Sequence, residues 1–263
     1  MNTGKNLQFI IGTTDDGETV YGDFQTTGNF ISSGHVGSGH ASYDEGAFVT
    51  SMMQNHSPDE LQFVMIDPKM VQLTPYEKTP HLMMPVAYTP HDAAVQIREI
   101  IKHVKVRHQL FESLGVKTLA EYNAQRAGND NPLHRKLPHI VLLCSEIADL
   151  MMIDRDYYEK AFIIIAQDSL KVGIHLYIAT QRPSLDVLTP ALLTSISGRI
   201  VFAVVSEIDS IHLLNVSGAE HITGQGTLLY RADATAEPVL VQSPYVSDEA
   251  VEKIVKQAIS RYE

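Results

Sequence analysis

The stretch that decides the fold spans residues 29–48 and reads NFISSGHVGSGHASYDEGAF. Its first four residues are typical of a short strand, and the glycine-rich run GHVGSGH follows directly. The residues after this run, to about position 54, predict a helix. A strand, a glycine-rich turn and a helix in succession form the repeating unit of α/β proteins.

The same alternation continues along the chain. Apolar runs of strand length occupy residues 61–67, 140–144, 174–180 and 199–204, and a long helical stripe runs from Ile97 to Leu114. Further helices are predicted over 157–171 and from Ser247 onward. The chain is therefore predicted to be an α/β protein with a mainly parallel sheet and helices on both faces. We expect a single domain over residues 1–263, in which 1–28 hold two N-terminal strands and 29–263 form the core.

Composition limits the function classes. Twenty Lys and Arg against 31 Asp and Glu leave a formal charge of −11, which argues against a large non-specific nucleic-acid surface. The single cysteine, Cys144, excludes an internal disulfide and suits a reducing cytoplasm, where we expect the protein to reside. No apolar run reaches the ~18–20 residues of a membrane span, so no membrane segment is expected.

The glycine-rich turn has the layout of a phosphate-binding loop, G-x-x-x-x-G-K-[ST], with histidine and alanine at its last two positions. Such a loop curls backbone N–H groups around phosphates at a helix N-terminus. A plain glycine turn between strand and helix is the alternative. Asp44 and Glu45 add negative charge where phosphates would approach. The candidate nucleotide-binding residues of the loop are Gly34, His35, Val36, Gly37, Ser38, Gly39, His40 and Ala41.

Several longer motifs occur in a fixed order. They include MIDPKM (65–70), EIADLMM (146–152), ATQRPS (179–184), GQGTLLY (224–230) and VSDEAVEKIV (246–255). From about Leu7 to Tyr262, the chain resembles the RecA-like P-loop motor core of the FtsK/SpoIIIE family of double-stranded DNA translocases. The resemblance implies ATP and Mg²⁺ as cofactors, duplex DNA as partner, and a homo- or hetero-oligomeric ring, hexameric in the family. The membrane segments and winged-helix module of many members have no counterpart here.

The resemblance also assigns roles, position by position. The family has Lys and Ser where this chain has His40 and Ala41, and Asp-Glu where it has Ser145 and Glu146. Glu146 would then be the catalytic carboxylate. The family's arginine finger falls at Leu170. Gln181 matches a nucleotide-sensing position, so Ser145 and Gln181 join the loop as nucleotide-binding candidates.

On the DNA-facing side, the resemblance implies that basic residues have been lost. A family lysine falls at Leu193 and an arginine at Ile211, which leaves Arg199 as the candidate DNA-binding residue. These departures lead to the hypothesis of a translocase motor core with degenerate nucleotide-binding motifs that hydrolyses ATP poorly or not at all, a pseudo-ATPase. The alternative is an active but atypical DNA-stimulated ATPase translocase.

Other candidates have simpler interpretations. No metal site is predicted, because His35 and His40 lack the spacing and partners of a zinc pattern and are expected to be solvated loop histidines. Ser145 lacks a G-x-S-x-G elbow and is interpreted as a strand-end serine. Asp67 could contact the nucleotide or cap a turn, and the sequence does not decide between the two.

Overall fold

The computed structural model describes residues 7–126 and 135–262. All its strands belong to one sheet, in the order β2-β1-β9-β8-β7-β3-β6-β5-β4. The strands are β1 Gln8–Thr13, β2 Thr19–Asp23, β3 Phe30–Ser33, β4 Leu61–Ile66, β5 His139–Cys144, β6 Ile174–Thr180, β7 Gly198–Phe202, β8 Thr227–Arg231 and β9 Val239–Gln242.

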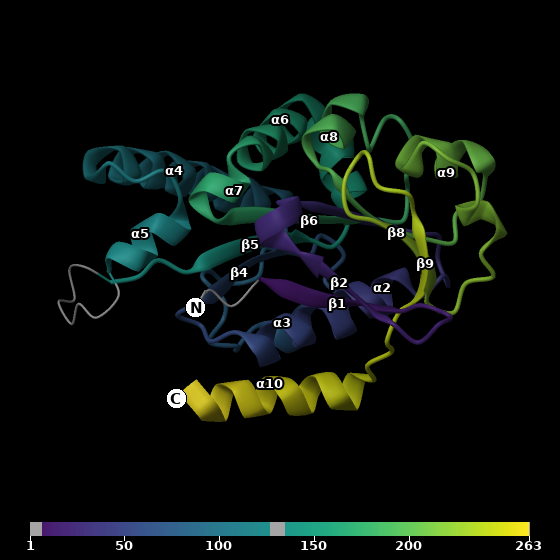
Figure 1. The fold of residues 1–263 in the computed structure, drawn as a ribbon, viewed down its shortest axis with the longest axis horizontal. Coiled ribbons are helices and arrows are strands. Elements are labelled where there is room, and N and C mark those ends of the chain that lie inside the picture. Colours follow the sequence, from purple (N-terminus) through teal and green to yellow (C-terminus); the bar gives the residue numbers. More distant parts are fainter. Residues whose placement is uncertain (1–6, 127–134, 263) are drawn as a thin grey trace.

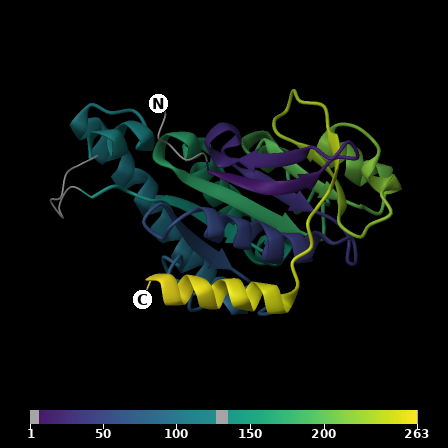
Figure 2. The same ribbon diagram turned by 60° about the horizontal axis from the view of Figure 1, so that its bottom comes forward.

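Helices cover both faces of this sheet, as Figure 1 shows. On one side lie α4, α6, α7 and α8, and on the other lie α3 and the C-terminal α10, which run side by side in both views (Figures 1 and 2). The helices are α1 Phe24–Thr27, α2 His40–Ser42, the π-helical η1 Tyr43–Phe48, α3 Val49–Asn55, the 3₁₀ turn η2 Thr74–Tyr76, α4 Pro90–Leu114, α5 Leu119–Gln125, α6 Ile147–Gln167, α7 Ser169–Val172, α8 Pro190–Ser195, α9 Glu207–Leu214, the 3₁₀ turn η4 Ala219–His221 and α10 Asp248–Tyr262.

The sheet is mixed, which corrects the expectation of a mainly parallel one. The five strands β7, β3, β6, β5 and β4 are mutually parallel, and the remaining pairings, through β8, β9, β1 and β2, are antiparallel. The two N-terminal strands therefore extend the same sheet. No pattern in the sequence predicts β9, because three of its four side chains are exposed and form no buried apolar run.

Helix α6 begins ten residues earlier than the predicted start at position 157. Its first half, from Ile147, is followed by a non-helical residue, Asp154, with φ −151° and ψ 81°. The carboxylate of Asp154 accepts a hydrogen bond from the Tyr157 backbone N–H at 3.1 Å, which caps the second half. The apolar pattern of the helix thus restarts at the kink, so the predicted helix covers only the half of α6 that follows Asp154.

Parallel pairing brings the ends of four strands to one edge. Ser33 of β3 pairs with Thr180 of β6, and Ile66 of β4 pairs with Cys144 of β5. The residues that follow these strands are the glycine loop, Gln181, Asp67 and the Ser145–Glu146 pair. The edge beyond the carboxyl ends of the strands is where α/β proteins bind ligands, so the candidate site lies there.

Each face of the sheet has its own buried core. One core packs α4, α6 and α8 on aliphatic strand residues, and the other is aromatic. In the aromatic core, Phe9 of β1 lies edge-on to Phe30 and Phe48, with ring centroids 5.0 and 4.8 Å away. Phe48 stacks on Tyr177 at 3.9 Å. These rings tie the N-terminal strand and the helix after the glycine loop to the central strand β6. Among residues 7–126 and 135–262, no helix is both long enough and apolar enough to cross a membrane.

The aromatic core leads to a stability prediction. Phe9 is fully buried, so Phe9→Ala should lower the free energy of unfolding by about 3–5 kcal/mol through lost burial and a residual cavity. Tyr21→Ala on the adjacent β2 is the control: Tyr21 is half exposed, and its loss should cost within about 0.5 kcal/mol. Urea unfolding measures both. Equal costs for the two variants would contradict the assigned core.

Candidate functional site

The glycine loop joins β3 to α2, and its conformation requires glycine at two positions. Gly37 and Gly39 have φ of 86° and 96°, in the left-handed region that other residues rarely adopt. A Cβ on Gly39 would also lie 2.6 Å from the backbone nitrogen of Gly226. The Gly226 N–H donates to the carbonyl oxygen of Ser38 at 2.9 Å, so a second glycine-rich turn supports the first.

A cavity of about 150 Å³ opens at this loop. It is lined by His35, Val36, Gly37, Gly39, His40, Ala41, Ser42 and Gln181. Loop and α2 residues thus face Gln181, which follows β6, across a space at a helix N-terminus. Of the predicted nucleotide-binding residues, the structure brings six of the loop and Gln181 together around this cavity.

His40 does not point to solvent, which corrects the expectation of a solvated loop histidine. Its side chain is 3% exposed, and Nε2 lies 2.8 Å from the Asp44 carboxylate one turn along. The other oxygen of Asp44 accepts hydrogen bonds from the hydroxyls of Ser32 and Tyr177, at 2.8 and 2.5 Å. The residue at the lysine position of the loop is therefore fixed in the protein interior, and Asp44 is neutralised there.

This pairing sets the charge of His40. Burial by itself lowers the pKa of an imidazolium, but the carboxylate of Asp44 outweighs burial and raises the pKa of His40 above its ordinary value of 6.5. Asp44 therefore favours the protonated form of His40 and holds its charge at the carboxylate.

Glu146 lies at the centre of a second group of contacts. One carboxylate oxygen accepts from the Thr180 hydroxyl at 2.5 Å and from the Ala148 N–H at 3.3 Å. The other accepts from the backbone N–H of Gln181 at 3.2 Å and lies 3.1 Å from Nζ of Lys69. The side chain is 3% exposed. Glu146 and Gln181 are therefore adjacent, and Lys69 joins them.

The structure decides between the two roles considered for Asp67, contact with the nucleotide and capping of a turn. One carboxylate oxygen accepts three backbone N–H groups, from Val71, Gln72 and Leu73, at 2.8–3.1 Å. The other accepts from the hydroxyl of Ser145 at 3.2 Å. Asp67 therefore organises the turn after β4, and Ser145 is a satisfied strand-end serine that supports it.

The side chains around the loop and the strand ends are not arranged to bind a magnesium ion. Ala41 has no hydroxyl, Ser145 donates to Asp67, and both oxygens of Asp67 and of Glu146 already have partners. Within residues 7–126 and 135–262, no cluster of three or more His, Cys, Asp or Glu could hold a metal.

A second cavity, of about 390 Å³, begins on the other side of Ser42, which lines both. Its walls come from the helix after the loop, the turn after β4 and the segment leading into α10. They comprise Ser42, Glu45, Gly46, Val71, Gln72, Pro75, Tyr76, Tyr245, Val246, Asp248, Val251 and Glu252. Burial, with the nearby carboxylates of Asp44, Asp67 and Asp248, raises the pKa of Glu45 to about 8.

Leu170 and Arg199 lie outside both cavities. Leu170, at the arginine-finger position, is about half exposed on α7. Arg199 is 3% exposed, and its guanidinium donates to the carbonyl oxygens of Leu193, Ile196, Gly198 and Leu213. With four of its five N–H donors used inside the fold, Arg199 is a structural residue, and the prediction that it contacts DNA is corrected.

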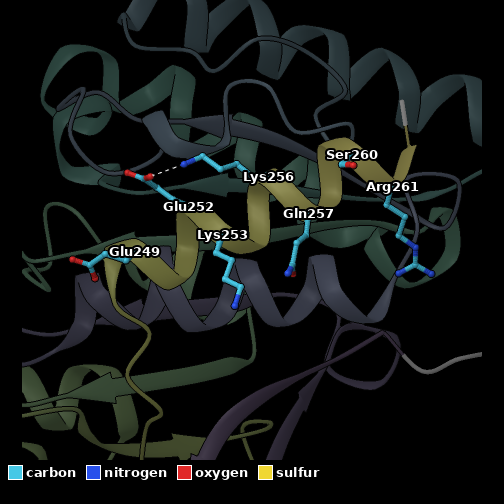
Figure 3. Close-up of a pocket in the computed structure, with 7 residues that line it drawn as sticks. All are labelled: Glu249, Glu252, Lys253, Lys256, Gln257, Ser260 and Arg261. Carbon is cyan, nitrogen blue, oxygen red and sulfur yellow. Dashed lines mark hydrogen bonds and ion pairs between the residues drawn. The ribbon is translucent and has the colours of Figure 1, made fainter.

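A third hollow, of about 610 Å³, lies along α10 and is lined by that helix alone. Figure 3 shows its residues spread over the outer surface of the helix, with Lys256 paired to Glu252 at 3.0 Å. It shares no residue with the loop cavity. Exposed side chains of mixed charge on one helix do not converge on a ligand, so we assign no site to it.

Sequence reasoning missed the partners that decide this chemistry. Asp44 was read as charge facing the phosphates, although its spacing of four from His40 on a helix was a signal for pairing. Lys69 stood within MIDPKM without a role. Tyr177 and Thr180 come from an apolar strand, and only the register of β6 against β3 brings them to the site.

Comparison with known proteins gives a consistent result. The model of the FtsK/SpoIIIE family matches residues 5–185. A protein named DNA translocase FtsK, from Leptospira interrogans serovar copenhageni, is 38% identical over 255 residues, which are 97% of this chain and 27% of the relative. DNA translocase SpoIIIE of Bacillus subtilis strain 168 is 35% identical over 254 residues, 95% of this chain and 32% of the relative. The chain thus spans about a third or less of the length of these relatives.

Solved structures agree on the fold. The pCW3 conjugation coupling protein TcpA, in its monomer form with ATPγS, superposes with a TM-score of 0.81 at 22% identity, covering 96% of this chain and 71% of that one. The cytoplasmic domain of the type VII secretion ATPase EccC from Thermomonospora curvata gives 0.83 at 22% identity, covering 97% and 31%. The expected RecA-like P-loop fold is confirmed.

The buried pair at the loop yields a prediction. Asp44→Leu leaves the imidazole of His40 buried without its carboxylate, and should lower the free energy of unfolding by about 3–5 kcal/mol. In the Asp44→Leu background, His40→Leu should cost less than it does in the wild type, with a coupling of ~1–3 kcal/mol. A denaturant double-mutant cycle at pH 6 measures this, and strictly additive effects would show that the two residues do not interact.

Glu45 gives a pH-dependent prediction. An unfolded carboxyl group ionises near 4.5 and the folded one near 8, so between these values the folded protein keeps a proton that the unfolded chain has released. Stability therefore falls as pH rises from 4.5 to 8. Glu45→Gln should remove this loss, so its gain over the wild type should grow from pH 5 to pH 8 and then level off. Urea unfolding at pH 5, 6.5 and 8 measures it. Glu112→Gln, at an exposed site on α4, is the control and should show no such trend.

Proposed function

Because this chain belongs to the FtsK/SpoIIIE family, we propose that it is a nucleotide-binding motor-core homologue that hydrolyses ATP slowly or not at all. One observation carries the proposal. The side chain at the lysine position of the loop is turned inward and paired with Asp44, while the loop itself keeps its conformation.

The two cavities support nucleotide binding. Backbone N–H groups at a glycine loop and helix N-terminus suit phosphates, and the loop cavity is bounded there by Gly37, Gly39 and Ala41. Ser42 lines both this cavity and the larger one, so a ligand with phosphates at the loop could extend its base past Ser42. Tyr245 of the larger cavity is 77% exposed and offers aromatic surface for a base. The residues in place thus fit ATP itself.

This chain lacks several of the side chains that would accelerate hydrolysis. Position 40 offers no free cation, position 41 no hydroxyl, and Leu170 is aliphatic where the family resemblance places an arginine finger. Loss of such an arginine alone is expected to lower the rate of phosphoryl transfer by ~10³–10⁵. What remains is Glu146, held in place by Thr180 and Gln181.

Duplex DNA and a ring assembly form the second part of the proposal. The relatives that span nearly the whole chain are named DNA translocases, and we infer duplex DNA as the partner on that basis. We propose that residues 29–263, with the two N-terminal strands in the same sheet, act as one motor unit in a ring of copies or relatives. Binding to DNA should be weak and strongly salt-dependent, because the chain carries a net charge of −11.

An active but atypical translocase is the alternative, and the fixed position of Glu146 favours it. Four hydrogen-bonding or ionic partners hold this candidate catalytic carboxylate in one position, and departure of Lys69 would leave one of its oxygens able to orient a water molecule. The turnover measurement below separates the two.

We predict little or no phosphate release from MgATP, with or without duplex DNA. A restored variant carrying His40→Lys, Ala41→Ser, Ser145→Asp and Leu170→Arg should turn over only when Asp44→Leu is added. Without that change, Asp44 would draw the new lysine into the same inward pair. Steady-state phosphate release measures each variant, and a fluorescent ATP analogue checks that all bind nucleotide.

The restored variant that keeps Asp44 is the matched control. Turnover by the five-fold variant alone supports a motor core that has lost its chemistry. Turnover by the unmodified chain in the typical enzyme range of ~1–10³ s⁻¹, rising with DNA, would establish the atypical translocase instead.

A further inference from the structure

Lys69 occupies a fixed place beside the loop cavity. The turn that carries it is shaped by Asp67, whose carbonyl oxygen accepts from the Met70 N–H at 3.1 Å and whose carboxylate binds the next three N–H groups. Nζ of Lys69 lies 3.1 Å from the carboxylate of Glu146 and 3.4 Å from Oε1 of Gln181. Gln181 is part of the wall of the loop cavity.

The loop cavity lacks another cation. No Lys or Arg is among the residues found to line it in the described part of the chain, and the charge of His40 is held by Asp44. Arg182 follows Gln181, but its guanidinium contacts Asp186 at 3.8 Å and the Met152 sulfur at 3.3 Å. Lys69 is therefore the cation whose contacts reach the cavity wall.

The side chain of Lys69, in contrast to its backbone, is only partly enclosed. Its side chain is 37% exposed, whereas that of Glu146 is 3% exposed. An ammonium group on a flexible four-carbon stem can exchange one anionic partner for another with little rearrangement. If Lys69 leaves, Glu146 keeps its hydrogen bonds from Thr180, Ala148 and Gln181, so its carboxylate is not stranded.

We propose that Lys69 exchanges its ion pair with Glu146 for the terminal phosphate of a bound nucleoside triphosphate. Lys69 thereby supplies the positive charge that His40 does not offer to the phosphates. This makes the site selective for triphosphates. This inference rests on the proposed nucleotide binding. Glu146 and the phosphate compete for one lysine, so the ion pair holds the site in its nucleotide-free arrangement.

The test measures binding of fluorescent N-methylanthraniloyl ATP, ADP and AMP to the full chain. Lys69→Met should weaken ATP binding by on the order of 10- to 100-fold, as expected for a lost charge-assisted hydrogen bond, and leave AMP binding unchanged. Lys69→Arg should retain much of the ATP affinity. Glu146→Gln should tighten ATP binding because it frees Lys69, and the double variant with Lys69→Met should lose that gain.

Lys102→Met is the matched control, since Lys102 pairs with Glu99 at 2.6 Å on the surface of α4. It should leave all three affinities unchanged, and urea midpoints confirm that each variant is folded. A wild type that binds none of the three nucleotides overturns the proposed function itself. A wild type that binds them while Lys69→Met has no effect, or weakens AMP as much as ATP, overturns only the role of Lys69.

Discussion

The buried ion pair between His40 and Asp44 is the constraint on which the rest of the site depends. Two charged groups inside a protein are tolerated when they are paired, and here the carboxylate of Asp44 also accepts hydrogen bonds from the Ser32 and Tyr177 hydroxyls. Such a pair adds little net stability but is costly to break. It therefore fixes the side chain at the lysine position of the loop in one inward orientation, whatever occupies the cavity outside.

A phosphate-binding loop usually combines two properties: its backbone binds phosphates and its lysine neutralises their charge. The inward orientation of His40 separates the two. The backbone of the loop can still receive phosphates, because its conformation depends on Gly37, Gly39 and the supporting Gly226. We propose that charge neutralisation comes instead from the turn after β4, where Lys69 contacts Gln181 and Glu146. In our proposal, the groups that bind the nucleotide and the groups that would hydrolyse it therefore lie on different elements. The groups for binding are all present, whereas those for hydrolysis are not.

Sequence patterns predicted the parallel strands well, because these strands follow from local signals. Apolar runs marked the buried strands β4, β5 and β6, and the glycine loop marked the edge beyond them. The antiparallel strand β9 escaped because it is short and mostly exposed, and the start of α6 was hidden by the kink at Asp154. The contact of Asp44 with Tyr177 and the contacts of Arg199 could not be predicted either, since each depends on tertiary neighbours that bury a charged side chain.

The fold itself requires glycine in the loop, whether or not a nucleotide binds there. Gly39 is required by its positive φ and by the close approach of Gly226, and neither demand involves a nucleotide. A chain that stopped hydrolysing ATP would still need this glycine to keep β3, α2 and the turn before β8 together. The glycine pattern is therefore evidence for the fold, and the chemistry must be argued from side chains. At this site those are His40, which faces inward, and Lys69, which does not.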